Sequence, residues 1–500
     1  MNKIRYTALF LLLVLTVGLF AGCGESTSAA LSQAGNWYTA SGRKLELKAD
    51  GTFLLEGEAE GGVWRQTSEG VLKITDGKGT FDATVTEGET KTLTFGPYGT
   101  FTAENEALLQ TLASVTRMPL VSVGAFVEGY AAVSWERDGV TESGLIDRSG
   151  NLVCKLPVTG TAFSLKAIHN GTALLELSLE SYRLVEISSG KVLATSGTDY
   201  DRCYGYTDAG LAVQKADPAT RETLYGCIGW DGKLVGEWFR PAERSARLNN
   251  NASTQGWMIL DYSNYDGQAS TVVKRITYLY NIDSGKVFRL EDGDAIYYTT
   301  LPDGSVYCKG PLRFADGADK EATEVTYANF RIFPDGTLKE ETELGNVSAT
   351  AGNFAVTPGE KTVLTDVTTK EKITLDLPTY AQNISFYGDY GFVSYVHTGG
   401  TPYGSVIDKT GKVLSDPIRL EYDADHEIRA TFTESGYLVL KDIFDSSWTV
   451  ICTPTGEVVM HGAKYPRVQV ADKDLFCYND TYIDRDGRVL MDRVAVSAGQ

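Results

Sequence analysis

The dominant pattern of this chain is a short apolar run rich in β-branched residues, a tight turn that closes on glycine, and a second apolar run. The clearest copy is Tyr403–Leu414, YGSVIDKTGKVL. Glycine suits the turn because it takes a positive φ without a steric penalty, so each copy predicts a β-hairpin. Looser copies begin at Gly144, Val185, Tyr225, Tyr280, Val450 and Thr481.

A second element precedes each hairpin from about Val121 onward, namely a glycine followed by a short apolar strand. It recurs at Gly129, Gly171, Gly210, Gly256, Gly304, Gly352, Gly391 and Gly436, with a degraded last copy near Asp474. Intervals of 39 to 48 residues match the four short strands of a propeller blade. We therefore predict an all-β chain with a propeller of about eight four-stranded blades, within a range of seven to nine. A linear β-solenoid is the alternative, which would need caps that the sequence does not show.

Residues 35–103 follow a different pattern, in which apolar and polar residues alternate in short runs separated by Asp-Gly or Glu-Gly pairs. Such alternation predicts half-buried strands, and so many of them in a short stretch predict a small antiparallel barrel. We expect side chains such as Trp37, Phe53, Trp64 and Phe81 to fill its interior, with a bound apolar ligand as the alternative.

The stretch 104–116, ENEALLQTLASVT, is the one convincing helix after the first residues. Leu108, Leu109, Leu112 and Val115 recur at helical spacing, and this apolar stripe is expected to pack on another element. The sequence thus divides into a signal peptide (1–22), a flexible tether (23–34), a small barrel (35–103), a helical connector (104–118), a propeller (119–493) and a tail (494–500).

The first residues predict export. Lys3 and Arg5 precede an apolar run, residues 8–20, that is short for a membrane span but has the length of a signal-peptide core. The run ends in FAGC, which resembles the lipobox of bacterial lipoproteins, with Phe20 where that family usually has Leu. The resemblance implies that Cys23 is lipidated on sulfur and becomes the mature N-terminus. We expect a protein anchored at the outer face of the bacterial cell membrane; an ordinary secretory signal is the alternative.

Both predicted domains resemble known families. The GxW of Gly35–Trp37, the DGTF of Asp50–Phe53 and the second GxW of Gly62–Trp64 look like the small lipocalin-like domains of bacterial lipoproteins. The repeat from Val121 to Met491 resembles the WG repeats of bacterial proteins, although Tyr or Ser stands where that pattern has Trp. Some copies also look like the quinoprotein-type repeats of envelope assembly lipoproteins. None of these families implies a single chemistry.

The net charge bears on the kind of partner, and the cysteine spacing bears on metal binding and disulfides. The formal net charge of −19 repels phosphate backbones, so nucleic acid is not an expected partner. The six cysteines after Cys23 show no metal-ligand spacing. Because most of them lie in strand-like runs, we expect free buried thiols, with three disulfides as the alternative.

No catalytic motif stands out. The histidines, which we expect at the surface rather than as ligands, are His169, His397, His426 and His461, and no metal or cofactor is predicted. Aspartates at the turns have a structural reason, because a carboxylate there accepts backbone N–H bonds. The long segments 217–224, 262–276 and 309–325 are expected to be loops that carry partner contacts, with Tyr262 and Tyr265 as candidate contact residues. We expect a monomeric, non-catalytic binding or scaffold protein for an envelope protein or glycan; a glycan hydrolase with paired carboxylates is the alternative.

Overall fold

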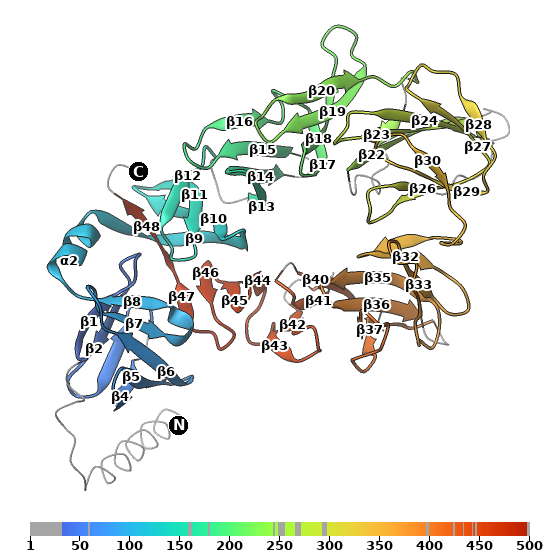
Figure 1. Cartoon of the computed structure of the whole chain (residues 1–500). Coiled ribbons are helices and arrows are strands. Elements are labelled where there is room, and N and C mark those ends of the chain that lie inside the picture. The colour runs from blue at the N-terminus through green and yellow to red at the C-terminus, as the bar shows by residue number, and fades with distance from the viewer. Residues whose placement is uncertain are drawn as a thin grey trace. The chain divides into compact units, whose positions relative to one another are not determined.

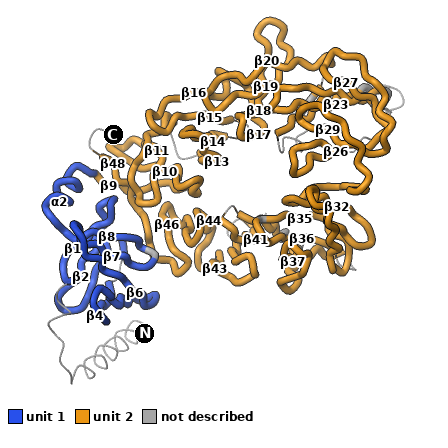
Figure 2. Tube along the Cα trace, in the orientation of Figure 1, with its two compact units in different colours: residues 1–115 blue, residues 116–500 orange. Residues whose placement is uncertain are grey.

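The computed structural model describes residues 33–497, apart from 59–60, 159–162, 179–180, 244–245, 249–255, 266–271, 293–297, 397–399, 424–425, 434, 443 and 446–447. The expected signal peptide, nearly all of the tether and the lipidation site Cys23 lie outside the described residues. The chain divides into two compact units, residues 1–115 and 116–500 (Figure 2).

Unit 1 contains a closed antiparallel barrel (Figure 1), which among its described residues has eight strands. The strands are β1 (Gly35–Tyr38), β2 (Lys44–Leu47), β3 (Thr52–Leu55), β4 (Gly62–Ser68), β5 (Val71–Asp76), β6 (Gly79–Thr86), β7 (Thr92–Phe95) and β8 (Thr100–Ala103), with a 3₁₀ turn η1 (Gly96–Tyr98) between the last two. The barrel closes where Trp37 and Tyr38 of β1 pair with Ala103 and Thr102 of β8.

The alternating sequence of unit 1 gives one core inside the barrel. Leucines and aromatic residues at every second strand position point inward, and Trp37, Phe53 and Trp64 are all buried there. The Trp37 indole donates to the Gln33 carbonyl at 3.3 Å and the Trp64 indole to the Lys48 carbonyl at 3.0 Å. Phe81 packs against this core from a partly buried position. The side chains expected to fill the barrel are therefore in its interior.

One α-helix, α2 (Glu106–Ala113), follows the barrel in the described chain. The Asn105 side chain caps it by accepting a hydrogen bond from the Leu108 amide at 2.8 Å. No residue of α2 is buried, and Leu109 is 41 % exposed. Leu108 and Leu112 are half-buried, so the leucine stripe, which was expected to pack on another element, is only partly covered; the helix ends at Ala113, and Val115 already begins a strand.

Unit 2 forms a propeller, which in the described part of the chain has nine small antiparallel sheets, numbered here in chain order (Figure 1). Sheet 1 contains β9 (Val115–Val127), β10 (Tyr130–Arg137), β11 (Val140–Asp147), β12 (Leu152–Lys155) and β48 (Arg493–Ser497), and sheet 2 contains β13 (Ser164–His169), β14 (Thr172–Ser178), β15 (Ser181–Glu186) and β16 (Val192–Thr195). Sheet 3 contains β17 (Arg202–Tyr206), β18 (Gly210–Ala216), β19 (Thr223–Gly229) and β20 (Leu234–Phe239). Sheet 4 contains β21 (Arg247–Leu248), β22 (Trp257–Tyr265), β23 (Val272–Asn281), β24 (Val287–Asp292), β27 (Leu312–Asp316) and β28 (Thr323–Val325).

The later sheets keep the same up-and-down order. Sheet 5 contains β25 (Tyr298–Thr300), β26 (Val306–Lys309), β29 (Asn329–Ile332) and β30 (Leu338–Glu340), and sheet 6 contains β31 (Ala349–Ala351), β32 (Phe354–Thr357), β33 (Val363–Asp366) and β34 (Lys372–Thr374). Sheet 7 contains β35 (Ala381–Tyr387), β36 (Tyr390–Val396), β37 (Pro402–Asp408) and β38 (Ile418–Arg419), and sheet 8 contains β39 (Glu421–Asp423), β40 (His426–Phe432), β41 (Leu438–Asp442), β42 (Thr449–Cys452) and β43 (Val458–His461). Sheet 9 contains β44 (Gln469–Asp472), β45 (Leu475–Tyr478), β46 (Thr481–Ile483) and β47 (Val489–Met491).

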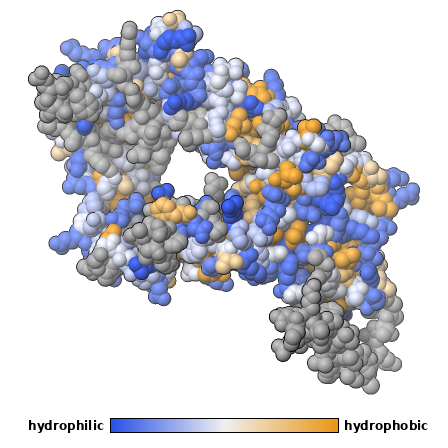
Figure 3. Space-filling model, turned by 180° about the vertical axis from the view of Figure 1, so that it is seen from behind, coloured by the Kyte–Doolittle hydropathy of each residue, from blue (hydrophilic) through white to orange (hydrophobic). Residues whose placement is uncertain are grey.

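Each sheet of unit 2 is buried against its two neighbours. A separate cluster of apolar side chains lies between each consecutive pair, such as Leu174 and Leu184 of sheet 2 with Leu211 and Val213 of sheet 3. The series closes on itself, because sheet 9 packs on sheet 1 through one further cluster. This closure is what separates a propeller from the linear solenoid, and the all-β prediction of a small barrel followed by a propeller is confirmed. Figure 3 shows an opening through the middle of unit 2.

The two ends of unit 2 meet in sheet 1. The last strand, β48, hydrogen-bonds beside β9, and the Leu120 amide donates to the Asp492 carbonyl at 3.0 Å. From sheet 9, the Tyr482 hydroxyl donates to the Gly124 carbonyl of β9 at 2.8 Å. Val494 and Val496 of β48 are buried in the same cluster. The ring is therefore closed by both a shared sheet and a shared core.

Two of the expected loops consist largely of strands where the structure describes them, while residues 266–271 of the first lie outside the described residues. The segment 262–276 belongs largely to the long hairpin of β22 and β23, in which Tyr262 lies opposite Ile276, so its polar sequence is paired backbone. Within 309–325, β27 and β28 form a hairpin that leaves sheet 5 and pairs with β24 of sheet 4. Leu312, Phe314 and Val325 are then buried between these two sheets. Only 217–224 lies mainly in a turn.

The six cysteines in the described residues are all free and buried, as expected. Burial raises the pKa of the Cys203, Cys227 and Cys477 thiols to about 12. A thiol with such a pKa carries almost no reactive thiolate at neutral pH. These cysteines therefore act as small core residues. Among the described residues, no helix is long and apolar enough to cross a membrane.

Candidate functional site

An open pocket of about 330 Å³ lies where strand ends and turns of sheets 1, 2 and 3 meet. Sheet 1 contributes Val127 and Glu128 from the turn between β9 and β10. Sheet 2 contributes the end of β13, Lys166 to His169. Sheet 3 contributes Tyr206 to Asp208 after β17 and Trp230 after β19. Three consecutive blades therefore build one site.

Trp230 is the centre of this pocket, which we call the aromatic pocket. Its side chain is only 8 % exposed, and its indole N–H donates to the Thr207 carbonyl at 2.9 Å. The His169 ring stacks on it, with 5.1 Å between ring centroids, and Tyr206 meets it edge-on at 6.2 Å. Tyr206 itself is 43 % exposed. The pocket thus offers the Tyr206 ring to solvent on a fixed aromatic base.

The local sequence explains why Trp230 lies there. It occupies the second position of a tight turn in which the Gly232 amide donates to the Gly229 carbonyl at 2.8 Å. Arg148 and Arg485 hold the same position in the turns of sheets 1 and 9. Gly232 has φ 79°, and a Cβ there would lie 2.5 Å from the Leu193 carbonyl oxygen, so this turn requires glycine.

Two further contacts hold the tyrosine side of the pocket. The Tyr206 hydroxyl donates to the Lys166 carbonyl of sheet 2 at 3.1 Å, which joins neighbouring blades. The Thr207 hydroxyl donates to Asp283 of sheet 4 at 3.1 Å. The turn that carries Tyr206 is therefore tied to blades on both sides, so the pocket is preorganised.

Lys166 is neutralised within its own blade. Its ammonium group lies 2.6 Å from a carboxylate oxygen of Glu176, which also accepts from Ser164 at 3.2 Å and Tyr182 at 3.3 Å. Burial alone would raise the pKa of Glu176, but these three partners together hold it below its usual value. Burial, helped by Glu176, raises the pKa of Tyr182 to about 12. Glu176 therefore stays charged at neutral pH and cancels the charge of Lys166.

Glu128 and Asp208 supply the remaining charge at the pocket. Both are exposed, and neither forms an ion pair with a described residue. Glu128 takes φ 49° and Gly129 φ 86°, the backbone of a two-residue hairpin turn, which fixes the carboxylate at the tip between β9 and β10. The pocket therefore combines aromatic rings with two uncompensated negative charges.

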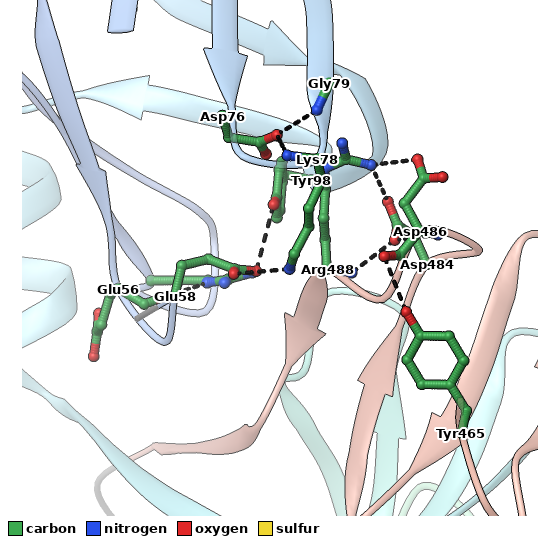
Figure 4. A network of polar contacts seen from close by, with 11 residues as sticks. Glu56, Glu58, Asp76, Lys78, Gly79, Tyr98, Tyr465, Asp484, Asp486 and Arg488 are labelled. Carbon is green, nitrogen blue, oxygen red and sulfur yellow. Dashed lines mark hydrogen bonds and ion pairs between the residues drawn. The ribbon is translucent and has the colours of Figure 1, made fainter. Parts of the chain in front are cut away.

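Turn carboxylates elsewhere have the structural role that the sequence suggested. In sheet 9, Asp484 accepts from the Asp486 amide at 2.9 Å and the Arg488 amide at 2.8 Å. The buried Arg488 guanidinium pairs with Asp484 and Asp486 (Figure 4). In sheet 7, hydrogen bonds from Thr410 and Lys412 lower the pKa of Asp408 despite partial burial. These carboxylates stabilise their turns by accepting backbone N–H bonds.

The predicted site residues are placed as follows. Cys23 lies outside the described part of the chain. Tyr262 is half-buried on β22 and packs against the core between sheets 3 and 4, and Tyr265 ends that strand with its side chain outside the described atoms. Their role in partner binding stays a prediction. Neither residue lines the aromatic pocket.

The residues that line the aromatic pocket were not predicted from the sequence as a site. His169 was expected simply at the surface, whereas it is half-buried and stacked on Trp230. His461 is exposed as expected and lies edge-on to Trp448, while the side chains of His397 and His426 lie outside the description. A usable signal was present in the turn GWDG, where Trp230 replaces the polar residue of other copies.

The pocket resembles a binding site more than a metal centre. In the part of the chain that the structure describes, no three His, Cys, Asp or Glu side chains come together to hold a metal ion. What the arrangement can do is stack on, and attract, a ligand that fits aromatic rings and carboxylates.

Comparisons with known proteins give distant structural similarities only. No family model matches the chain, and no curated protein matches it. BamB from Moraxella catarrhalis is 12 % identical with a TM-score of 0.27, over 79 % of this chain and 92 % of that one. The β-propeller domain of the trilobed protease from Pyrococcus furiosus is 12 % identical with a TM-score of 0.30, over 69 % and 98 %. The designed protein Ika8 is 12 % identical with a TM-score of 0.33, over 68 % and 98 %. Similarities at this level do not indicate a shared function.

Proposed function

We propose that this chain is a bacterial protein that is lipid-anchored at the outer face of the cell membrane and binds a partner through its propeller without catalysis, as a receptor or scaffold. The observation that carries the proposal is the aromatic pocket, which three blades assemble and hold open. Exposed tyrosine on a rigid base is typical of binding surfaces, because it gives contact area at a low entropic cost. The partner is an envelope protein or a glycan.

Anchoring through Cys23 and the family resemblances belong to the same proposal. The lipobox-like FAGC would place the body outside the membrane on a small, polar tether. The resemblances to WG repeats and to lipocalin-like domains are compatible with this proposal, although neither implies a single chemistry.

The hydrolase alternative has less support. A glycosidase needs one carboxylic acid with a raised pKa beside a second carboxylate. For the described residues, the resolved pKa shifts of carboxyl groups are downward, as at Glu142, Glu176 and Glu341, where hydrogen bonds and the charges of lysine or arginine together outweigh burial. These groups suit ion pairs and turns.

Membrane attachment is tested on the full chain by Cys23→Ala. We expect the variant to stay unprocessed or to be released, and to leave the detergent phase in a two-phase partition, while the wild type remains there. Processing and partitioning equal to the wild type would reject the lipid anchor.

Binding is tested by comparing capture from envelope extracts by the tagged wild type, Tyr206→Ala and Tyr380→Ala. Tyr380 is 51 % exposed and does not line the aromatic pocket, so it is the matched control. We expect one partner to be retained by the wild type and the control and lost from Tyr206→Ala. If Tyr206→Ala captures the same set as the wild type, or if the protein cleaves envelope glycans, the proposal is wrong.

A further inference from the structure

The charges of the aromatic pocket select the class of ligand. Lys166 is its one described ammonium group, and Glu176 neutralises it at 2.6 Å. The charges without a described ion-pair partner are the carboxylates of Glu128 on sheet 1 and Asp208 on sheet 3, which both line the pocket. The whole chain adds a formal net charge of −19. The electrostatic potential at the pocket therefore favours a cation.

The aromatic rings of the pocket also favour a cationic ligand. The faces of tyrosine and tryptophan carry negative partial charge and attract organic cations within about 6 Å. Trp230 is turned inward, so the accessible aromatic surface belongs to Tyr206, backed by the stacked pair of His169 and Trp230. Ala167 and Ile168 add apolar surface to the lining. An apolar carbon chain ending in a positive charge matches both parts of this lining.

We propose that the aromatic pocket binds an alkylammonium group, with its carbon chain against Tyr206 and its charge near Glu128 and Asp208. This inference rests on the proposed binding function and specifies its ligand. The group has two sources with one chemistry, a free amine or the side chain of a lysine on a partner protein. The pocket volume of about 330 Å³ accommodates either of them.

Four small probes separate charge from shape. The purified full chain is titrated in detergent, at about pH 8 so that histidine is ordinarily neutral, with 1,4-diaminobutane, Nα-acetyl-lysine N-methylamide, 1,4-butanediol and succinate. Binding is followed by calorimetry and by saturation-transfer NMR. We expect the first two probes to bind with a Kd on the order of 1 mM, and the diol and succinate to bind at least about tenfold more weakly. A diol that binds as tightly as the diamine would overturn the proposal, as would preferred binding of succinate.

Matched variants locate the site. Glu128→Gln and Asp208→Asn should each weaken diamine binding roughly two- to fivefold, and together roughly tenfold, as expected for partly exposed charge pairs. Tyr206→Ala should cost roughly two- to fivefold through the lost ring. The control is Asp138→Asn, because Asp138 is also exposed and also precedes a glycine at positive φ, but lies at the other end of β10. Equal losses in the control would show a general charge effect and reject the site.

The two proposals fail in different ways. If the diamine binds and the variants weaken it, but Tyr206→Ala still captures every envelope partner, the ammonium site stands and the receptor function falls. If Tyr206→Ala loses its partner while no ammonium probe binds, the receptor stands and the ligand class is wrong. Tighter binding of the lysine derivative than of the diamine would identify a partner protein as the source, and the reverse would identify a free amine.

Discussion

The barrel of unit 1 and the propeller of unit 2 close their sheets in different ways. The barrel closes through backbone pairing of β1 with β8 around one common core. The propeller closes by packing sheet 9 on sheet 1, and each pair of sheets has its own core. A defect in the barrel therefore reaches every strand, whereas a defect in the propeller is felt mainly by two neighbouring sheets. The packing of sheet 9 on sheet 1 closes the ring, and it is the one contact on which all sheets of the propeller depend.

The sharpest test of this comparison removes residues 493–500, which include β48. Sheet 1 loses a strand, and the buried Val494 and Val496 leave the core shared with sheet 9. We expect a loss of at least about 5 kcal/mol from the ring, seen as a broad, non-cooperative transition of unit 2 by hydrogen exchange with mass spectrometry. Exchange of unit 1 should be unchanged. Removing residues 498–500 alone is the control and should have little effect.

Truncating one large core side chain in each unit should lower the stability by a smaller amount. Trp37→Ala empties the common core of the barrel and should cost about 3–5 kcal/mol, with faster exchange in all barrel strands. Leu364→Ala in the core between sheets 6 and 7 should cost about 2–4 kcal/mol, with faster exchange confined to those two sheets. Uniformly faster exchange throughout unit 2 after Leu364→Ala would contradict the idea of separate cores.

Acid should affect the units unequally. Among described carboxyl groups with a lowered pKa, only Asp50, which is held by Thr52, belongs to unit 1, whereas unit 2 has Glu142, Glu176, Asp217, Asp231, Asp335, Glu341, Asp366 and Asp408. A folded pKa below the unfolded value gives stability that is present above about pH 4 and is lost as pH falls through the folded pKa. Urea unfolding at about pH 6 and about pH 3 should therefore show the larger loss in unit 2.

Glu341 offers a control for the acid effect. It is buried, lies 3.3 Å from Lys370 and 3.6 Å from Arg331, and accepts from the Glu343 amide at 3.0 Å. Glu341→Gln should lower stability at neutral pH and make its dependence on acid shallower, because one depressed pKa is removed. An unchanged pH dependence would mean that other groups dominate.

The smallest effect is expected at a single turn. The Asp408 carboxylate accepts from the Thr410 amide at 2.8 Å and the Lys412 amide at 3.0 Å. Asp408→Ala should cost about 0.5–1.5 kcal/mol and stay within sheet 7. The nearby Asp389 makes an exposed pair with Lys409 and is the control, since Asp389→Ala should be close to neutral. Similar costs for the two variants would mean that the turn bonds are not the stabilising contacts.

The fold could be predicted because its signals are local. Hairpin turns, alternating positions and glycine-led strands lie within a few residues of one another. The glycine-led strands become the second strand of their sheets, except in sheet 8, where the strand after Gly436 is the third. The blade number was less certain because the ninth copy lacks the glycine. Asp474 takes φ 58° in its place, a conformation that aspartate adopts more readily than most residues. The leucine stripe of α2 is only partly covered, because periodicity shows which face of a helix is apolar but not how fully another element covers it.

The candidate site could not be predicted in the same way. His169, Tyr206 and Trp230 come from different turns, and only the ring places them together. Composition indicated that tyrosines carry contacts, but it favoured Tyr262, whose strand continues the core. A polar segment in the sequence can still be paired backbone, and this is why the expected loops proved to be hairpins.

The hairpin of β27 and β28 restricts how the number of repeats can change. In the sequence it lies between β26 and β29 of sheet 5, but it pairs with β24 of sheet 4. Sheets 4 and 5 are therefore joined by the connecting chain and also by this hairpin. Duplication or deletion of one repeat at this point would separate the hairpin from its partner edge and expose Leu312 and Phe314. Between sheets 2 and 3, the ladders stay within each repeat, so an exchange there keeps every pairing intact. Growth or shortening of this ring by whole repeats is therefore tolerated at some junctions and blocked at this one.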